Sequence, residues 1–192
     1  MILYHFTRRQ NVALIQQHGI NPGKFPGGES ANFKLVSLTS RLSPVGHGLF
    51  RGEALYEGTR AFDVVSGIFP ELVVGKLPNR SMKMFDQTEV AIEVEIPLVD
   101  QNLWGLWYFA SQVVPLLESA EQDLFISASL ASADFPCNDA CNARLDARTI
   151  FYRPLVRAGL INNRGWHFYK GAVAPALINR VLYRQPDGSY AQ

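Results

Sequence analysis

The feature that most constrains the fold of this 192-residue chain is an alternation of apolar and polar residues over positions 89–96. The alternating run reads Val90, Ala91, Ile92, Glu93, Val94, Glu95 and Ile96. A period of two places successive side chains on opposite faces of a strand. The pattern therefore predicts a sheet strand with one face in the core and the other in water.

Further short apolar runs predict the other strands of such a sheet. They span residues 3–6, 35–40, 166–169 and 180–183. A helix is predicted over residues 11–18, with Val12, Leu14 and Ile15 on one side, and Gly19 supplies its C-terminal stop.

The remaining segments give weaker patterns. Gly and Pro interrupt every apolar run in residues 51–85, so no element is predicted there. A helical region is predicted from about 104 to 120, and a mixture of helix and loop over 127–148. No repeat or linker-like change of composition divides the chain, so we expect one α+β domain over residues 1–192.

The charge balance limits the classes of partner. Eighteen Lys and Arg stand against 17 Asp and Glu, a net charge of +1, so no strong overall field attracts nucleic acid or an anionic membrane. A local basic patch stays open. The sequence shows neither the apolar core of a signal peptide nor the roughly 18 apolar residues of a membrane span. We therefore expect a cytoplasmic chain without membrane contact.

The two cysteines, Cys137 and Cys141, are four positions apart in a polar stretch. A structural zinc site usually needs a second pair of ligands nearby, and no His lies close to them in the sequence. A metal site and a local disulfide remain alternatives. Two reduced thiols are the expected state, and no metal is expected.

Two stretches carry a family resemblance. The first is a strand with His5 and Thr7, then a helix ending at Gly19, then the strand Val36-Ser37-Leu38-Thr39-Ser40. The second is the late run from Trp166 to Ile178, which contains the turn Ala172-Val173-Ala174-Pro175-Ala176-Leu177-Ile178. Both resemble the ADP-ribosyltransferase superfamily, in particular the branch that holds the DarT-type nucleic-acid ADP-ribosyltransferases and the RNA 2′-phosphotransferases.

The resemblance implies a split, mostly antiparallel sheet with flanking helices that holds NAD in a cleft. His5 matches the His that bonds the adenosine ribose, and Thr7 lies on the same face of the strand. Ser37 and Thr39 match positions near the nicotinamide, and Trp166 is placed in the same cleft. Hydroxyls at strand ends also commonly bond unpaired backbone groups at the edge of a sheet, which is the alternative role for Ser37 and Thr39.

Two further candidates follow the second predicted strand. His47 lies between two glycines, which would let the backbone approach a ligand closely, although an ordinary turn has the same composition. Arg51 could neutralise the pyrophosphate, because a guanidinium forks onto phosphate oxygens. Its alternative is a solvated surface charge.

The sequence departs from the family at the catalytic acid. Members normally carry a Glu just ahead of the final strand motif, and residues 163–167 contain no carboxylate. Glu93 (or Glu95) from a neighbouring strand, or His167, could take its place. The alternative for the two glutamates is the exposed face of the strand. The RNA 2′-phosphotransferases work without that Glu.

Aromatic residues gather at 104–109 without interleaved basic residues, which favours core packing over base stacking. Basic residues gather instead late in the chain, where they could contact phosphates or a protein partner, or form a solvated helix face. They are Arg144, Arg148, Arg153, Arg157 and Arg164.

The resemblance implies an NAD-dependent ADP-ribosyltransferase that cleaves the nicotinamide–ribose bond and modifies a macromolecule, with DNA, RNA and protein as candidate acceptors. Toxin, defence and repair settings are all open. The alternatives are an enzyme similar to the RNA 2′-phosphotransferases and a non-catalytic module that binds NAD or another nucleotide.

Overall fold

The computed structural model of the chain describes residues 1–23, 34–44, 49–58, 62, 66–67, 70–78, 81–105 and 165–192. In these ranges short strands predominate. In chain order the elements are β1 (Ile2–Thr7), η1 (Arg9–Asn11), α1 (Val12–His18), β2 (Leu35–Thr39), β3 (Ala54–Tyr56), η2 (Pro70–Leu72), β4 (Val73–Lys76), β5 (Ser81–Met84), β6 (Val90–Glu95), β7 (Leu103–Gly105), β8 (Trp166–Lys170), η5 (Pro175–Leu177), β9 (Ile178–Arg184) and β10 (Tyr190–Ala191).

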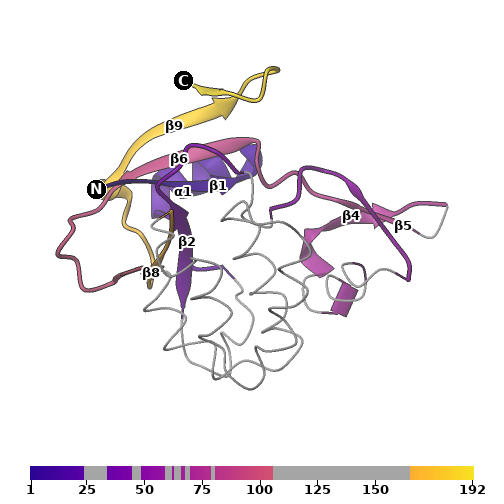
Figure 1. Cartoon of the computed structure of the whole chain (residues 1–192), viewed down its shortest axis with the longest axis horizontal. Coiled ribbons are helices and arrows are strands. Elements are labelled where there is room, and N and C mark those ends of the chain that lie inside the picture. Colours follow the sequence, from indigo (N-terminus) through magenta and orange to yellow (C-terminus); the bar gives the residue numbers. More distant parts are fainter. Residues whose placement is uncertain are drawn as a thin grey trace, which may run out of the picture.

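The described strands form two sheets (Figure 1). The larger has seven strands in the order β10-β9-β6-β1-β2-β8-β7, and the smaller has three in the order β3-β5-β4. Every strand pair in both is antiparallel. The expected mostly antiparallel sheet is therefore confirmed, as are the strands predicted at residues 3–6, 35–40, 89–96, 166–169 and 180–183.

The larger sheet is nearly divided between β1 and β2. Six register pairs join β1 to β6, from Ile2↔Glu95 to Thr7↔Val90. The single register pair Tyr4↔Thr39 joins β1 to β2. In Figure 1, β2 and β8 run crosswise to β1, β6 and β9. We call this weak junction the β1/β2 split.

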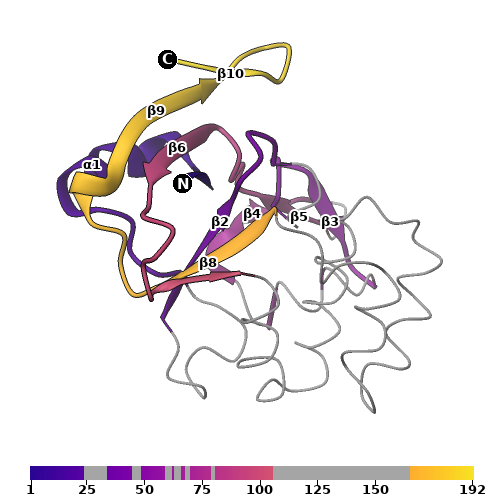
Figure 2. The ribbon, with the colours of Figure 1, turned by 60° about the vertical axis from the view of Figure 1, so that its left-hand side comes forward.

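One face of the sheet packs against α1, which lies along β1 and β6 (Figure 2). Val12 and Ile15 of the helix are buried, and Gly19 ends it with φ +82°, as predicted. A Cβ at Gly19 would lie 2.1 Å from the Val173 carbonyl oxygen, so this stop requires glycine. The prediction that Leu14 shares one side of the helix with Val12 and Ile15 is wrong, because Leu14 lies about 200° around the helix from Val12 and is 62% exposed.

The opposite face of β6 is not the wet surface that the alternation predicted. Glu93 is 1% exposed, and of the two glutamates only Glu95 is exposed. Phe6, Ala91 and Leu182 form a second apolar cluster on this face, with Tyr190 of the C-terminal hairpin packed against it. The prediction failed because side chains of the neighbouring strands fill this face: Asn179 and Arg180 bond Glu93, and Tyr190 packs on Phe6.

The region around Trp104 also differs from expectation. Residues 103–105 form strand β7, whereas a helix was predicted from about 104, and Trp104 is buried at the sheet edge. The rest of that predicted helix, residues 127–148, both cysteines and the five late arginines lie outside the described residues. Among the described residues, no helix has the length and apolarity of a membrane span.

Candidate functional site

His5 lies at the β1/β2 split, one residue past the last register pair. Its Nδ1 lies 3.1 Å from the Ser37 carbonyl oxygen, so the imidazole replaces a ladder bond between the strands. A carbonyl only accepts, which assigns the proton to Nδ1 and the lone pair of the neutral ring to Nε2. Burial lowers the pKa of His5 and outweighs the opposing effect of the Ser37 bond, so the ring is neutral near pH 7.

Ser37 continues this chain of contacts toward β8. Trp166 Nε1 lies 2.7 Å from Ser37 Oγ, and because an indole nitrogen only donates, the hydroxyl is the acceptor. The Ser37 O–H is then available to donate, and the residue is exposed. The Trp166 ring packs on Phe168 with centroids 5.3 Å apart, which fixes its direction.

A cavity of about 50 Å³ lies at the same junction. Its lining residues are Tyr4, His5, Phe6, Ser37, Leu38, Thr39 and Leu49. Ligand sites usually exceed roughly 300 Å³, so this cavity alone is too small to enclose a whole nucleotide. We call it the split cavity. Tyr4 and Leu49 were missed from the sequence, because nothing in their local pattern distinguishes a cavity wall from core.

The two candidate threonines have different environments. Thr39 lines the split cavity, and its Oγ1 accepts from the Arg41 backbone N–H at 3.1 Å. Thr7 lies on the same face of β1 as His5, as expected, but it is buried. Its Oγ1 accepts from Asn11 Nδ2 at 3.0 Å, next to the start of α1. Thr7 is therefore not part of the split cavity.

Glu93 is the best-bonded carboxylate of the sheet. It lies opposite Tyr4 on β1 and Arg180 on β9. Arg180 donates from Nε to Oε1 at 3.0 Å and from Nη2 to Oε2 at 2.6 Å, and Asn179 Nδ2 donates to Oε1 at 2.7 Å. The bonds from Arg180, followed by that from Asn179, lower the pKa of Glu93 despite burial. The Glu93 oxygens are thus already hydrogen-bonded, and they lie on β6, one strand away from the split cavity.

The Glu93 carboxylate also affects the cavity wall. Burial, and then the nearby Glu93 charge, raise the pKa of the Tyr4 phenol. Tyr4 lines the split cavity, so the Glu93 side chain backs one of its walls.

The other catalytic candidates do not line the split cavity. His167 lies opposite Leu38, so its side chain is on the other sheet face from Ser37 and Trp166. Its buried Nδ1 has no hydrogen-bond partner among the described residues, and burial lowers its pKa. Arg51 is exposed outside the cavity, where its backbone N–H donates to Glu53. His47 lies outside the described residues.

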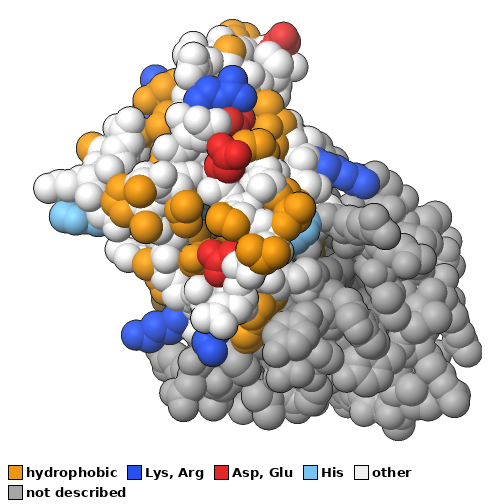
Figure 3. All heavy atoms as spheres, turned by 90° about the vertical axis from the view of Figure 1, so that its left-hand side faces the viewer, with side chains coloured by type: hydrophobic (Ala, Val, Ile, Leu, Met, Phe, Trp, Pro, Cys, Tyr) orange, Lys and Arg blue, Asp and Glu red, His pale blue; other side chains and the backbone are white. Residues whose placement is uncertain are grey.

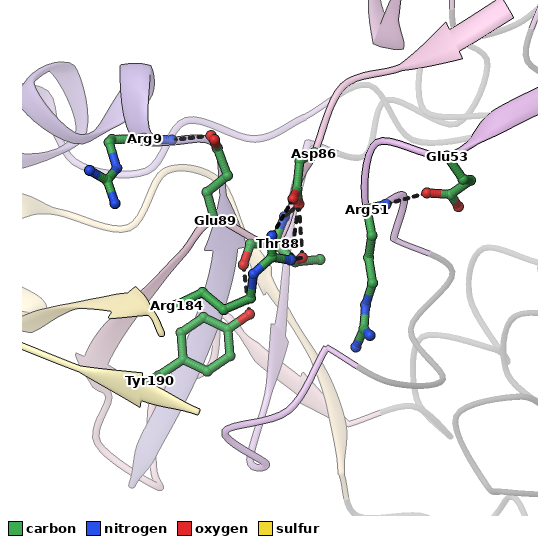
Figure 4. Close-up of polar contacts among 8 residues, drawn as sticks. All are labelled: Arg9, Arg51, Glu53, Asp86, Thr88, Glu89, Arg184 and Tyr190. Atoms are coloured by element: carbon green, nitrogen blue, oxygen red, sulfur yellow. Dashed lines mark hydrogen bonds and ion pairs between the residues drawn. The ribbon is translucent and has the colours of Figure 1, made fainter. Parts of the chain in front are cut away.

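A second polar cluster holds the C-terminal hairpin (Figure 4). Arg184 pairs with Asp86 at 2.5 Å and donates to Thr88 Oγ1, and the Tyr190 hydroxyl donates to the Thr88 carbonyl at 2.7 Å. Burial acts to raise the pKa of Asp86, but the bonds from Thr88 and Arg184 outweigh it and lower the pKa. Nothing in the local sequence pairs residues 86–88 with 184–190, so this cluster was missed.

The face turned to the viewer in Figure 3 carries scattered basic side chains, with acidic side chains set among apolar ones. Among the residues that the structure describes, no three His, Cys, Asp or Glu side chains gather as a metal site requires. No family model, curated protein or solved structure matches the chain.

Proposed function

We propose that this chain is an NAD-dependent ADP-ribosyltransferase of the DarT-like branch, which cleaves the nicotinamide–ribose bond and modifies a macromolecular acceptor, DNA or RNA among the candidates. The observation that supports it is the polarity of the split cavity. His5 Nε2 offers a lone pair and Ser37 Oγ offers a proton, on adjacent strands.

The two groups suit a ligand with several hydroxyls, such as a ribose. One hydroxyl can donate to His5 Nε2 and another can accept from the Ser37 O–H. The register pair Tyr4↔Thr39 puts the two side chains on opposite faces of the sheet, so they would reach the ligand from the two sides of the split. The Ser37 carbonyl orients the His5 ring, and Trp166 Nε1 orients the Ser37 hydroxyl. Neither bond uses the lone pair of His5 Nε2 or the proton of the Ser37 hydroxyl. Thr39 and the Tyr4 ring complete the walls. The resemblance supports the same role for His5 from the sequence.

One observation favours the alternative of a non-catalytic nucleotide-binding module. Loss of nicotinamide leaves positive charge on the ribose, and a nearby carboxylate would stabilise that charge. Both oxygens of Glu93 are bonded to Arg180 and Asn179. In our proposal Glu93 therefore supports Tyr4, and it contacts the ribose only where Arg180 moves away.

The test combines binding and turnover. NAD affinity is measured by calorimetry, and nicotinamide release and transfer of adenosine-labelled NAD are followed with DNA, RNA, 2′-phosphorylated RNA or cell extract. His5→Ala removes the only side-chain acceptor assigned to the ribose, so NAD affinity should fall about tenfold or more. Glu95→Gln, an exposed change at the end of β6, is the matched control and should bind normally.

The outcomes separate the candidates. Binding with nicotinamide release and label transfer supports the transferase, and binding without release supports the module. Release of the 2′-phosphate from RNA would favour the phosphotransferase type. Absence of NAD binding in the wild-type chain, or equal binding by wild type and His5→Ala, would overturn the proposal.

A further inference from the structure

A much larger hollow lies beyond the end of β1. It has a volume of about 450 Å³ and is lined by Arg8, Arg9, Gln10, Phe85, Asp86 and Glu89. This volume falls within the roughly 300–1,000 Å³ of small-molecule sites. Arg8 is three residues beyond His5, roughly 10 Å along an extended chain. The hollow shares no lining residue with the split cavity.

Two guanidinium groups are held in place at this hollow by aromatic rings. Arg8 Cζ lies 4.2 Å from the centroid of the Phe85 ring, and Arg9 Cζ lies 5.0 Å from that of Tyr183. Within the described ranges, neither guanidinium is paired with a carboxylate. A guanidinium stacked on a ring keeps its N–H donors in one plane and loses little freedom when it binds an oxyanion.

The two carboxylates of the hollow already have partners. Asp86 pairs with Arg184 at 2.5 Å and also accepts from Thr88. Glu89 Oε2 accepts from the Arg9 backbone N–H at 2.9 Å, while the Arg9 side chain extends away from it (Figure 4). Arg184 neutralises Asp86, so of the lining residues the Arg8 and Arg9 guanidiniums remain with one carboxylate, Glu89. The hydrogen-bonding capacity left over is therefore mainly that of donors.

Gln10 also adds a donor. In the orientation that satisfies both side chains, its amide oxygen lies 3.2 Å from Nη1 and Nη2 of Arg8. The amide NH₂ is then directed away from Arg8, and Arg8 keeps N–H donors beyond the two used by Gln10.

We propose that this hollow, the Arg8/Arg9 site, binds a phosphate group. Phosphate oxygens match the planar fork of a guanidinium, and two forks and an amide can bond one group together. A free phosphate or nucleotide and a nucleic-acid backbone present the same chemistry. The site is independent of NAD binding at His5.

The test titrates the full chain with inorganic pyrophosphate by calorimetry, and with a labelled single-stranded oligonucleotide by fluorescence anisotropy. The variant Arg8→Gln/Arg9→Gln removes both forks. Loss of charge-assisted hydrogen bonds should weaken pyrophosphate binding about 10- to 100-fold. Lys76→Gln/Lys83→Gln removes the same charge from exposed positions on the small sheet, and its affinity should stay within about twofold of wild type.

Two further variants test the chemistry and the fold. Arg8→Lys/Arg9→Lys keeps the charge without the planar fork, so it should fold and still lose several-fold in affinity. Glu89→Gln removes a negative charge and keeps an acceptor for Arg9, so it should bind pyrophosphate more tightly than wild type.

The two probes identify the source of the phosphate. If the oligonucleotide binds and the double glutamine variant lowers its log–log salt slope by about 1.4, a nucleic-acid backbone is the ligand. If only pyrophosphate binds, a free phosphate or nucleotide is the ligand. The site is overturned if Arg8→Gln/Arg9→Gln and Lys76→Gln/Lys83→Gln lose the same affinity for pyrophosphate. It is also overturned if neither probe binds the wild-type chain. His5→Ala should leave both affinities unchanged, which separates this result from the fate of the NAD proposal.

Discussion

Glu93 and His5 lie on neighbouring strands of one sheet, but they differ in how many of their hydrogen bonds are made within the protein. Glu93 lies where β6 pairs with both neighbours, and its oxygens accept three bonds from Arg180 and Asn179. His5 lies where the β1–β2 ladder is reduced to one register pair, and its ring makes one hydrogen bond within the described part of the chain. Where strands pair fully, polar groups stabilise the fold. Where the ladder stops, the His5 ring keeps unused hydrogen-bonding capacity.

The largest effect on stability is expected at Glu93. Glu93→Gln keeps the shape but removes the charge, and it leaves one Arg180 donor facing an amide N–H group. The free energy of unfolding should fall by about 1–2 kcal/mol, at the low end for charged bonds because the Arg180 side chain is 50% exposed. The midpoint of urea unfolding measures the loss.

The control for this variant is Glu95→Gln on the same strand. Glu95 is exposed, so its substitution should change stability by less than about 0.5 kcal/mol. If Glu93→Gln and Glu95→Gln lose the same free energy of unfolding, the bonds of Glu93 stabilise the fold no more than an exposed glutamate does. The fully paired part of the sheet would then not differ from the split at His5 in the way described.

Acid should remove the same contribution. The bonds from Arg180 hold the pKa of Glu93 below the value of an unfolded glutamate, about 4.3. The unfolded chain then binds the proton first, so this stability is complete above that value and is lost as pH falls through the folded pKa. The urea midpoints of wild type and Glu93→Gln should differ near neutral pH and converge on acidification.

A difference that stays constant from about pH 7 to about pH 3 would contradict this assignment. Wild type and variant should both retain an acid-sensitive component from Asp86, because the bonds from Thr88 and Arg184 lower its pKa as well. The informative quantity is therefore the difference between the two curves.

The sequence predicts most clearly those elements whose signal is local. Period-two alternation is sufficient for β6, and the glycine stop is sufficient for the end of α1. The small sheet gives no such signal, because its strands are three or four residues long and pack around Met82 and Met84 instead of following a repeat.

The site shows the same division. His5, Ser37 and Trp166 come together as neighbours on β1, β2 and β8, which the family resemblance suggests and local patterns do not, since the contacts span 32 and 129 positions. The bonding of Glu93 depends on the register between β6 and β9. That register includes a shift at Glu93/Val94, so no period in either strand could identify Arg180 as the partner.

The smallest stability effect is expected at the split itself. Ser37→Ala removes the acceptor of Trp166 Nε1 and the donor that we assign to the ribose. Ser37 is exposed, so water can replace the hydroxyl, and the free energy of unfolding should change by less than about 0.5 kcal/mol. NAD affinity should nevertheless fall about three- to tenfold, the value of one neutral hydrogen bond.

Trp166→Phe keeps a ring against Phe168 and leaves the Ser37 hydroxyl without its donor, so it should weaken NAD binding less than Ser37→Ala does. If Ser37→Ala instead destabilises the chain as much as Glu93→Gln and binds NAD normally, the Ser37 hydroxyl is structural like Glu93, and the split holds no ligand-binding capacity at this position.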